Sequence, residues 1–166
     1  MGSRLRLKAG VNETLGLIEI LNSTYNGKCD LARIAREHNL QIDEILHVVD
    51  TANTLGFINV VDGDLIITEA GKKLLDNDIT GKKKLIKSHL KKTKIFRILL
   101  TELEKLNERR LSHESLVKIF QTIFPDGEGY LRTVLFWGQF AELIGYDEVS
   151  DEIYLLEGLR KKRVER

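Results

Sequence analysis

One stretch of the chain, residues 41–68, restricts the fold more than any other. It begins with apolar residues at three- and four-residue spacing, which predicts an amphipathic helix: Ile42, Ile45, Leu46, Val49 and Leu55. Gly56 is expected to end that helix, because glycine adopts the left-handed conformation without a Cβ clash. Two β-rich runs then surround the turn Asp62-Gly63, and this arrangement predicts a β-hairpin.

The same pattern returns in residues 141–156. The frame Ala-x-x-(Leu or Ile)-Gly-aromatic occurs at residues 52–57 and again at 141–146, and an acidic turn and a second β-rich run follow in both places. A helix that leads into a two-stranded hairpin is the second half of a winged helix-turn-helix. The sequence therefore predicts two such units in one chain.

Further helices are predicted ahead of each hairpin. Apolar stripes mark residues 11–22 and 94–107, and a short helix at residues 30–40 is followed almost at once by the helix that begins at residue 41 or 42. Two helices separated by so short a turn form a helix-turn-helix element. In the second half, residues 128–144 occupy the position of the recognition helix. Helix N-caps are predicted at Thr68, Thr80, Thr93 and Ser112.

The predicted fold class is mainly α with small β-hairpins, an α+β architecture of tandem winged helix-turn-helix units. The expected divisions are winged-helix unit 1 at residues 1–78, a lysine-rich connecting helix at 79–93, winged-helix unit 2 at 94–157 and a charged tail at 158–166. Units of about 80 residues are large enough to form a small hydrophobic core each.

Composition excludes several classes of protein. The chain has 166 residues and a net charge of +1, so no overall field attracts it to nucleic acid or to a membrane surface. Cys29 is the only cysteine, which excludes an intramolecular disulfide and is typical of a reducing cytoplasm. No apolar run approaches the roughly 20 residues that a membrane span needs, so we expect a cytoplasmic protein without membrane insertion.

Several short motifs together point to one family. They are Asp30-Leu31-Ala32-x-Ile34-Ala35, Leu55-Gly56-Phe57, Gly63-Asp64-Leu65-x-Ile67-Thr68-x-Ala70-Gly71 and Trp137-Gly138-x-Phe140-Ala141-Glu142. With these motifs the chain resembles the C-terminal AAA-associated domain over residues 11–157. In that family the domain often follows the ATP-binding cassette of nitrate/sulfonate/bicarbonate-type ABC importers, and it also occurs as a free-standing chain. The resemblance implies no catalytic residues and no fixed ligand.

The sequence contains no nucleotide-binding cassette beside these motifs. A phosphate-binding loop needs G-x-x-x-x-G-K-(Ser or Thr), because successive backbone N–H groups and the lysine hold the phosphates. The run Gly81-Lys82-Lys83-Lys84 lacks the upstream glycine and the following hydroxyl residue. Any ATPase activity must therefore lie on another polypeptide, unless this chain is a fragment of a longer protein. The partner that the resemblance implies is an ABC-type ATPase on a separate chain.

No residue pattern supports an enzyme, a cofactor or a metal site. The four histidines show no H-x-x-x-H or similar ligand spacing. Cys29 lies beside Lys28, which could lower the pKa of its thiol, but no histidine is placed to act as a base. We expect a protein that is not an enzyme and that carries no cofactor.

Acidic residues dominate both predicted hairpins and form one candidate interaction surface: Asp62, Asp64, Asp147, Glu148, Asp151 and Glu152. The first predicted recognition helix carries acids and no Lys or Arg, and the second sets Arg132 against Glu128 and Glu142. Affinity for DNA comes mainly from Lys and Arg contacts with phosphate. DNA binding is therefore possible but disfavoured, whereas an acidic hairpin suits a basic protein surface.

Basic residues gather elsewhere, in a run without an intervening acid that forms the second candidate surface: Lys82, Lys83, Lys84, Lys87, Lys91, Lys92, Lys94 and Arg97. Lys84, Lys87, Lys91 and Lys94 would form a stripe on one helix, but a helix break at Thr93 would bend that stripe. Two interpretations stay open. The run is a solvated face of the connecting helix, or it is a docking surface for phosphate, nucleic acid or an acidic protein.

Three aromatic residues, Phe136, Trp137 and Phe140, fall at helical spacing in the second recognition helix. Such aromatics fill a core in most proteins, and the alternative is a surface for a partner or for a second copy of the chain. Together, these patterns predict a non-catalytic regulatory or protein-interaction module similar to the domain associated with ABC-importer ATPases. The alternative is a DNA-binding winged-helix transcriptional regulator, and a homodimer is possible because winged-helix proteins often dimerise.

Overall fold

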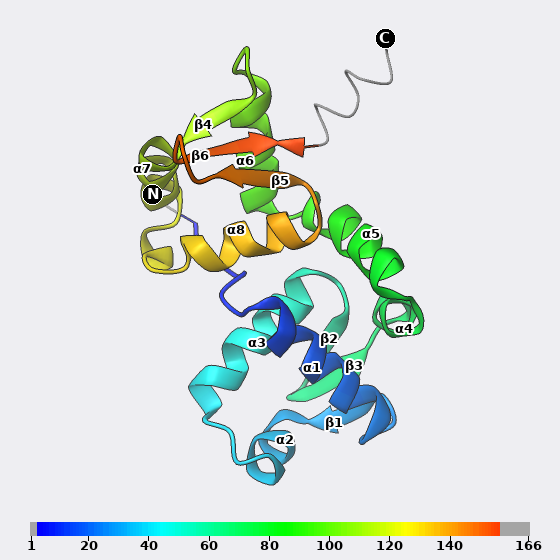
Figure 1. The fold of residues 1–166 in the computed structure, drawn as a ribbon. Helices are drawn as coiled ribbons and strands as arrows, with labels where there is room; N and C mark the ends of the chain where they lie inside the picture. The colour runs from blue at the N-terminus through cyan, green and yellow to red at the C-terminus, as the bar shows by residue number, and fades with distance from the viewer. Residues whose placement is uncertain (1–2, 157–166) are drawn as a thin grey trace. The chain divides into compact units, whose positions relative to one another are not determined.

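The computed structural model describes residues 3–156 and consists of helices with two small β-sheets (Figure 1). This confirms the predicted fold class, mainly α with small β-hairpins. Packing divides the chain between Ile86 and Lys87, and the short segment before Arg6 belongs with the later part. We name Arg6–Ile86 the first unit and the rest the second unit. The division falls inside the predicted connector at 79–93, and the boundaries given by the sequence stay predictions.

The first unit consists of helices and one three-stranded sheet. Its elements are α1 (Val11–Ser23), β1 (Lys28–Asp30), α2 (Leu31–Glu37), α3 (Ile42–Thr54), β2 (Ile58–Val61), β3 (Asp64–Ile67), α4 (Glu69–Asp76) and α5 (Ile79–Leu90), which crosses the division. The central strand β3 pairs antiparallel with both β1 and β2, so Leu65 lies opposite Cys29 on one side and Val60 on the other. The β2–β3 pair confirms the predicted hairpin. The sequence did not reveal β1, because three residues show no alternation.

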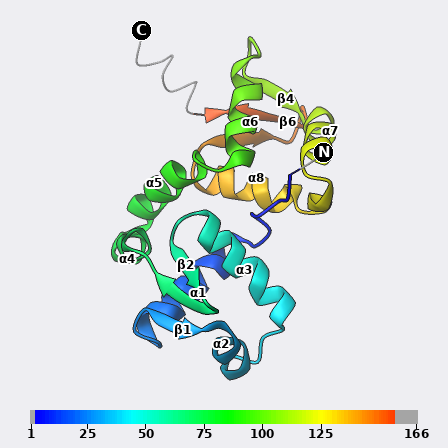
Figure 2. The same ribbon diagram turned by 180° about the vertical axis from the view of Figure 1, so that it is seen from behind.

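The second unit repeats this order. Its elements are α6 (Lys94–Glu104), β4 (Arg110–Ser112), α7 (His113–Ile123), the 3₁₀ turn η1 (Pro125–Gly127), α8 (Leu131–Phe140), β5 (Ile144–Asp147) and β6 (Glu152–Leu155). The strand order is β4-β6-β5, and the sheet lies beside α6, α7 and α8 in both views (Figures 1 and 2). Each unit thus runs helix, strand, helix, helix, strand, strand. The assignment of the units as winged helices stays a prediction.

The segment before Arg6 is tied to the second unit by backbone hydrogen bonds. Ser3 N donates to the carbonyl oxygen of Ile123 at 2.6 Å, and Leu5 N donates to Oδ1 of Asp126 at 3.0 Å. Leu5 is itself fully buried. The first few residues therefore contribute core and hydrogen bonds to a unit whose other residues lie more than eighty positions later in the chain.

Side-chain caps begin most of the predicted helices. The hydroxyls of Thr68, Thr93 and Ser112 accept from backbone N–H groups three residues ahead, as predicted. Because Thr93 caps α6, the predicted break between α5 and α6 is confirmed. The cap at Thr80 is wrong. The helix begins at Ile79, two residues before the Gly81 start that a Thr80 cap implies, and Oδ1 of Asp78 accepts from Gly81 N at 2.8 Å.

Helices α3 and α8 end with the same hydrogen bonds, in the pattern of a Schellman motif. In the first unit Phe57 N donates to the carbonyl of Ala52, and Gly56 has a φ of 82°. In the second unit Leu143 N donates to the carbonyl of Gly138, and the left-handed position is taken by Glu142, with a φ of 60°. The residue equivalent to Gly56 is therefore Glu142.

Gly145, which the repeated frame aligns with Gly56, has a different role. It lies in β5 opposite Tyr154, and a Cβ at this position would come within 2.3 Å of the Tyr154 ring. The sequence predicted that this helix ends at residue 144. In the structure α8 ends at Phe140. A glycine in a similar sequence frame serves backbone conformation in one unit and close side-chain packing in the other.

The core of the second unit explains the Trp-Gly motif. Trp137 is fully buried, and Ala141, the C-cap residue of α8, is buried four positions later. A Cβ on Gly138 would lie 2.8 Å from the side chains of Ile144 and Phe96. Glycine at this position therefore lets α8 approach β5 and α6 closely enough to bury the tryptophan.

Candidate functional site

The exposed face of α3 in the first unit is apolar with an acidic border. Ile42 is 47% exposed and Leu46 is 40% exposed, and they lie one helical turn apart. Asp43 and Glu44 are exposed beside them. The sequence placed Ile42 and Leu46 on the buried face, and this is wrong. The buried stripe consists of Ile45, Val48, Val49 and Ala52.

The β2–β3 hairpin of the first unit closes in a two-residue turn. Asp62 and Gly63 both have positive φ, 50° and 84°, which is the conformation of a tight type I′ turn. Asp62 is exposed at the turn, and Asp64 lies 3.9 Å from Nζ of Lys28 on β1. Val61 on the same hairpin is also exposed. This hairpin thus combines apolar side chains with carboxylates, as α3 does.

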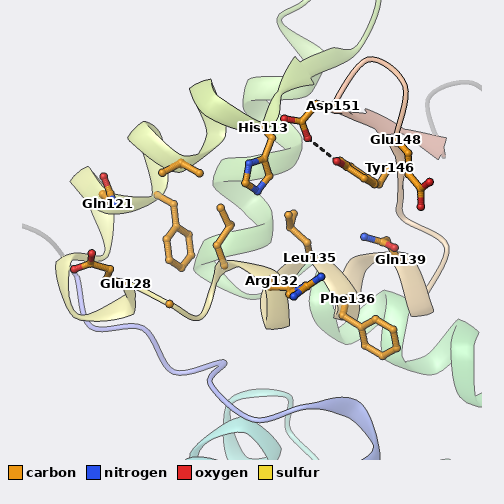
Figure 3. A pocket seen from close by; sticks show the side chains of 14 residues that line it. His113, Gln121, Glu128, Arg132, Leu135, Phe136, Gln139, Tyr146, Glu148 and Asp151 are labelled. Atoms are coloured by element: carbon orange, nitrogen blue, oxygen red, sulfur yellow. Dashed lines mark hydrogen bonds between the residues drawn. The ribbon is translucent and has the colours of Figure 1, made fainter.

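The second unit has a pocket of about 650 Å³ at the equivalent place, between α7, α8 and the β5–β6 hairpin (Figure 3). Its apolar lining comes mainly from α7 and α8: Val117, Phe120, Leu131, Leu135 and Phe136. Phe120, Leu131 and Leu135 are buried, whereas Phe136 is 52% exposed. The pocket therefore offers an apolar floor with an exposed aromatic ring at its edge.

Charged groups of mostly negative sign surround this pocket. Glu128, Glu148 and Asp151 line it and are exposed, and Arg132 is the basic residue among its lining side chains, with His113 and Gln139 also present. The sequence flagged the aromatics but not the pocket. Its lining residues are spread from position 113 to 151, and only the folded hairpin brings them together.

A tyrosine at the pocket orients one of these carboxylates. The Tyr146 hydroxyl donates to Oδ1 of Asp151 at 2.5 Å (Figure 3), and this hydrogen bond raises the pKa of Tyr146. Asp151 itself has a φ of 53°, the left-handed conformation, at the end of the β5–β6 turn. The carboxylate therefore has a defined position beside the aromatic ring.

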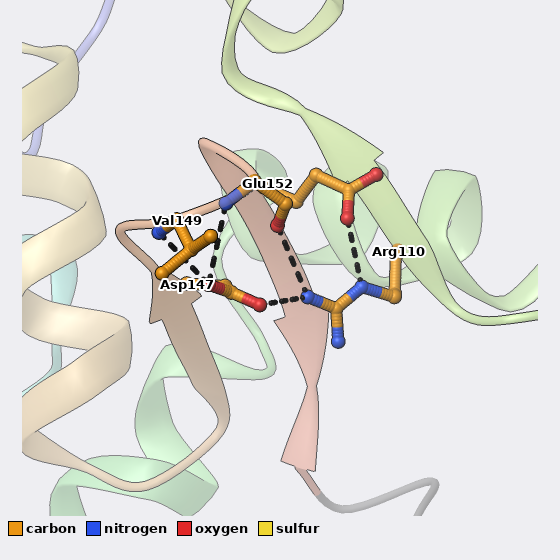
Figure 4. A network of polar contacts seen from close by, with 5 residues as sticks. Arg110, Asp147, Val149 and Glu152 are labelled. Carbon is orange, nitrogen blue, oxygen red and sulfur yellow. Dashed lines mark hydrogen bonds and ion pairs between the residues drawn. The ribbon is translucent and has the colours of Figure 1, made fainter.

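The turn between β5 and β6 in the second unit is held by an arginine from the neighbouring strand (Figure 4). Arg110 Nε donates to Oε1 of Glu152 at 2.9 Å, and Nη2 donates to Oδ2 of Asp147 at 2.7 Å. Oδ1 of Asp147 also accepts from the backbone N–H groups of Val149 and Ser150. One guanidinium from β4 thereby joins the last residue of β5 to the first residue of β6.

These contacts keep two acids of the predicted acidic surface ionised and in fixed positions. The hydrogen bond from Arg110 lowers the pKa of Glu152, and the backbone hydrogen bonds from Ser150 and Val149 are the main reason that the pKa of Asp147 is lowered. The two carboxylates share the single positive charge of Arg110, so the three side chains together keep one negative charge. Of the acids predicted on this hairpin, Glu148 and Asp151 are the ones that face the pocket.

The predicted basic residues do not share one helix. Lys82, Lys83, Lys84 and Lys87 lie on α5, Lys91 and Lys92 lie in the turn before Thr93, and Lys94 and Arg97 lie on α6. The chain also divides between Ile86 and Lys87. Lys94 Nζ donates to the Ser3 hydroxyl, and with Arg97 it lines a shallow hollow on α6 that includes Glu102. The basic tail at 158–166 lies outside the described residues.

A polar cluster beside α2 involves residues that the sequence did not single out. The Tyr25 hydroxyl donates to Glu37 at 2.6 Å, and Arg33 Nε donates to the other oxygen of Glu37 at 3.0 Å. The hydrogen bond to Glu37 raises the pKa of Tyr25 to about 12. This cluster fastens the α1–β1 turn to α2. Nearby Cys29 is buried, and burial raises the pKa of its thiol, whereas the sequence suggested that Lys28 could lower it.

Residues 3–156 show neither a membrane-spanning helix nor a cluster of metal ligands. No helix in this part of the chain is both long enough and apolar enough to cross a membrane. Among the same residues, no group of three or more His, Cys, Asp and Glu side chains is placed to hold a metal ion.

Fold and surface together define a class: a repeated helical unit with a small sheet, whose exposed helix faces combine apolar and acidic side chains. The chain belongs to the C-terminal AAA-associated domain family, whose sequence model matches residues 32–147. This confirms the resemblance seen in the sequence motifs. Comparison with curated proteins finds no match, and comparison with solved structures finds none either.

Proposed function

We propose that this protein is a non-catalytic interaction module that binds another protein through the exposed faces of α3 and α8 and their hairpins. The observation that carries the proposal is the composition of these faces. Ile42 and Leu46 on α3, and Phe136 on α8, are large apolar side chains exposed among carboxylates. Exposed apolar groups with a polar border are typical of protein-binding surfaces.

Family membership supports an ATPase as the partner. The domain family is named for its association with ATPases, and the sequence contains no phosphate-binding loop. The proposed role is therefore regulation or assembly of an ABC-type ATPase in the cytoplasm. The module itself performs no chemistry and needs no cofactor.

The electrostatics of α3 disfavour DNA as the partner. The helix carries Asp43, Glu44 and Asp50 and has no Lys or Arg along Ile42–Thr54. Duplex DNA is bound mainly through cation contacts with phosphate, so carboxylates at this position repel it. A DNA-binding transcriptional regulator stays the alternative function, because the lysines of α5 supply positive charge outside the recognition helix.

A titration with mixed-sequence duplex DNA separates the two functions. We expect no sub-micromolar binding at low or moderate salt. Sub-micromolar affinity that falls steeply with salt would overturn the proposal, and the triple variant Lys84→Glu, Lys87→Glu, Lys91→Glu would then abolish binding while Asp43→Asn would not.

Binding to a purified ABC-type ATPase domain, measured by calorimetry, tests the partner. We expect Ile42→Glu with Leu46→Glu to weaken this binding, because the double change places charge in the apolar patch of α3. The matched control is Glu19→Lys on the exposed face of α1, which should leave the affinity unchanged. Equal loss in both variants would show that α3 is not the contact.

A further inference from the structure

We propose that the pocket of the second unit binds a lysine- or arginine-bearing segment of the partner protein, with an apolar side chain of that segment seated on the pocket floor. That the ligand is a protein rests on the proposed function. The proposal adds the place where the segment binds and the chemistry that selects it.

The floor of the pocket suits an apolar anchor. Phe120, Leu131 and Leu135 are buried in the unit but present surface to the pocket. The volume of about 650 Å³ is in the range of sites that enclose a ligand rather than of a shallow dent. An apolar side chain placed there would remove both its own surface and the exposed ring of Phe136 from water.

The charges of the rim select a cationic segment. Three carboxylates, those of Glu128, Glu148 and Asp151, line the pocket against the single guanidinium of Arg132. The exposed rings of Phe136 and Tyr146 add faces on which a Lys or Arg side chain can lie. A phosphate-bearing ligand would meet net repulsion at the same place.

The positions of the acids indicate an elongated ligand. Glu128 precedes α8, whereas Glu148 lies in the turn between β5 and β6, and Figure 3 shows the two side chains at opposite ends of the pocket. A ligand that pairs with both carboxylates must extend from one end of the pocket to the other. A peptide segment can place basic residues toward both ends and its apolar residue between them.

The hairpin side of the pocket is held in place before a ligand arrives. Arg110 fixes Asp147 and Glu152, which flank the turn that carries Glu148. Tyr146 holds Asp151 by its hydroxyl. A rim with few remaining rotational freedoms loses less entropy on binding, which favours affinity for a segment of matching charge.

The test uses fluorescently labelled peptides of about 15 residues, long enough to form an amphipathic helix. One peptide consists of leucine and lysine in a helical pattern, and its twin has glutamate in place of every lysine. Fluorescence anisotropy with the whole chain should show saturable binding of the basic peptide and binding at least about tenfold weaker for the acidic twin.

Charge reversals locate the site. Glu128→Lys and Glu148→Lys should each weaken the basic peptide by about tenfold, and Phe136→Ser should do so without any change of charge. Glu108→Lys, an equal change at an exposed position of the same unit, should leave the affinity unaltered. Circular dichroism of each variant checks the fold, and Glu148→Gln gives a milder version of the same change.

Three results would overturn the inference. The first is no saturable binding of the basic peptide. The second is equal weakening by Glu108→Lys and Glu148→Lys, which indicates general attraction to an acidic protein. The third is binding of duplex DNA that Arg132→Glu removes, which also overturns the proposed function. In the first two cases the calorimetric test with the ATPase domain still stands, so the two failures can be distinguished.

Discussion

In the first unit the turn between β2 and β3 consists of Asp62 and Gly63, whereas four residues separate β5 from β6 in the second unit. The short turn is held by its own backbone conformation. The longer turn is held by side chains, with Asp147 accepting from two backbone N–H groups and Arg110 joining both strands. The same strand order is therefore compatible with two different ways of closing the hairpin.

The helix faces beside these hairpins differ in shape but agree in chemistry. The first unit exposes Ile42 and Leu46 on α3, and the second unit exposes Phe136 at the edge of a pocket. Carboxylates border both places. The two units therefore share an exposed apolar helix face with an acidic border. The local residues determine whether that face is flat or forms a pocket.

The largest expected effect on the free energy of unfolding comes from removing one buried aromatic residue in each unit. Trp137→Ala should lower the free energy of unfolding by about 3–5 kcal/mol, because it removes a fully buried ring. Phe57→Ala, in the first unit, should have an effect in the same range. Urea denaturation measures both. A loss below about 1 kcal/mol for either variant would show that the corresponding unit does not rely on that residue.

The next effect concerns two glycines at close approaches. A Cβ on Gly71 would lie 2.3 Å from the carbonyl oxygen of Phe57, and one on Gly138 would meet the side chains of Ile144 and Phe96 at 2.8 Å. The backbone of Phe57 cannot move aside as easily as the side chains around Gly138 can. We expect Gly71→Ala to cost about 3 kcal/mol and Gly138→Ala about 1–2 kcal/mol of unfolding free energy. The reverse order in denaturation experiments would contradict this ranking.

Changes at the two helix ends should have opposite signs. Gly56→Ala forces a side chain into the left-handed conformation and should cost about 1–2 kcal/mol, whereas Glu142→Gly relieves that conformation and should add up to about 1 kcal/mol. Thermal unfolding measures both variants. A destabilised Glu142→Gly would show that the side chain of Glu142 contributes more than its backbone conformation costs.

The acid dependence of stability should differ when Arg110 is removed. Asp147 and Glu152 have lowered pKa values in the folded protein, so their contribution is complete above the ordinary carboxyl range of roughly pH 4 to 4.5 and is lost as the pH falls through the lowered values. Arg110→Gln should reduce stability at neutral pH and flatten the decline in acid. Unchanged acid dependence, measured by thermal unfolding between neutral and acidic pH, would argue against the network.

The smallest effect compares the two tyrosine–carboxylate pairs. The phenol of Tyr25 should titrate near a pKa of about 12 because of its hydrogen bond to Glu37, and Glu37→Gln should lower that pKa. Asp151→Asn should likewise lower the raised pKa of Tyr146. Absorbance titration of phenolate follows both. No change in the Glu37→Gln variant would show that the hydrogen bond is not the cause.

Much of the scaffold could be predicted from local signals. The β2–β3 hairpin, the caps at Thr68, Thr93 and Ser112, and the break before α6 depend on residues a few positions apart. The strands β1 and β4 could not be predicted in this way, because each has three residues and is defined only by its pairing with β3 or β6. The pocket belongs to the same category, since its lining comes from separate helices and a hairpin.

The sequence by itself determined the fold class, the family and the presence of a repeated unit, because apolar periodicity, caps and turn residues act over short distances. Only the tertiary structure decided which repeated residues are equivalent. Gly56 and Glu142 are equivalent because each takes the left-handed position in the same pattern of backbone hydrogen bonds, although the sequence frame aligns Gly56 with Gly145. The structure also decided which acids form ion pairs. Asp147 and Glu152 look like surface acids in the sequence, and they become part of an internal network because pairing with β6 brings Arg110 within hydrogen-bond distance of both.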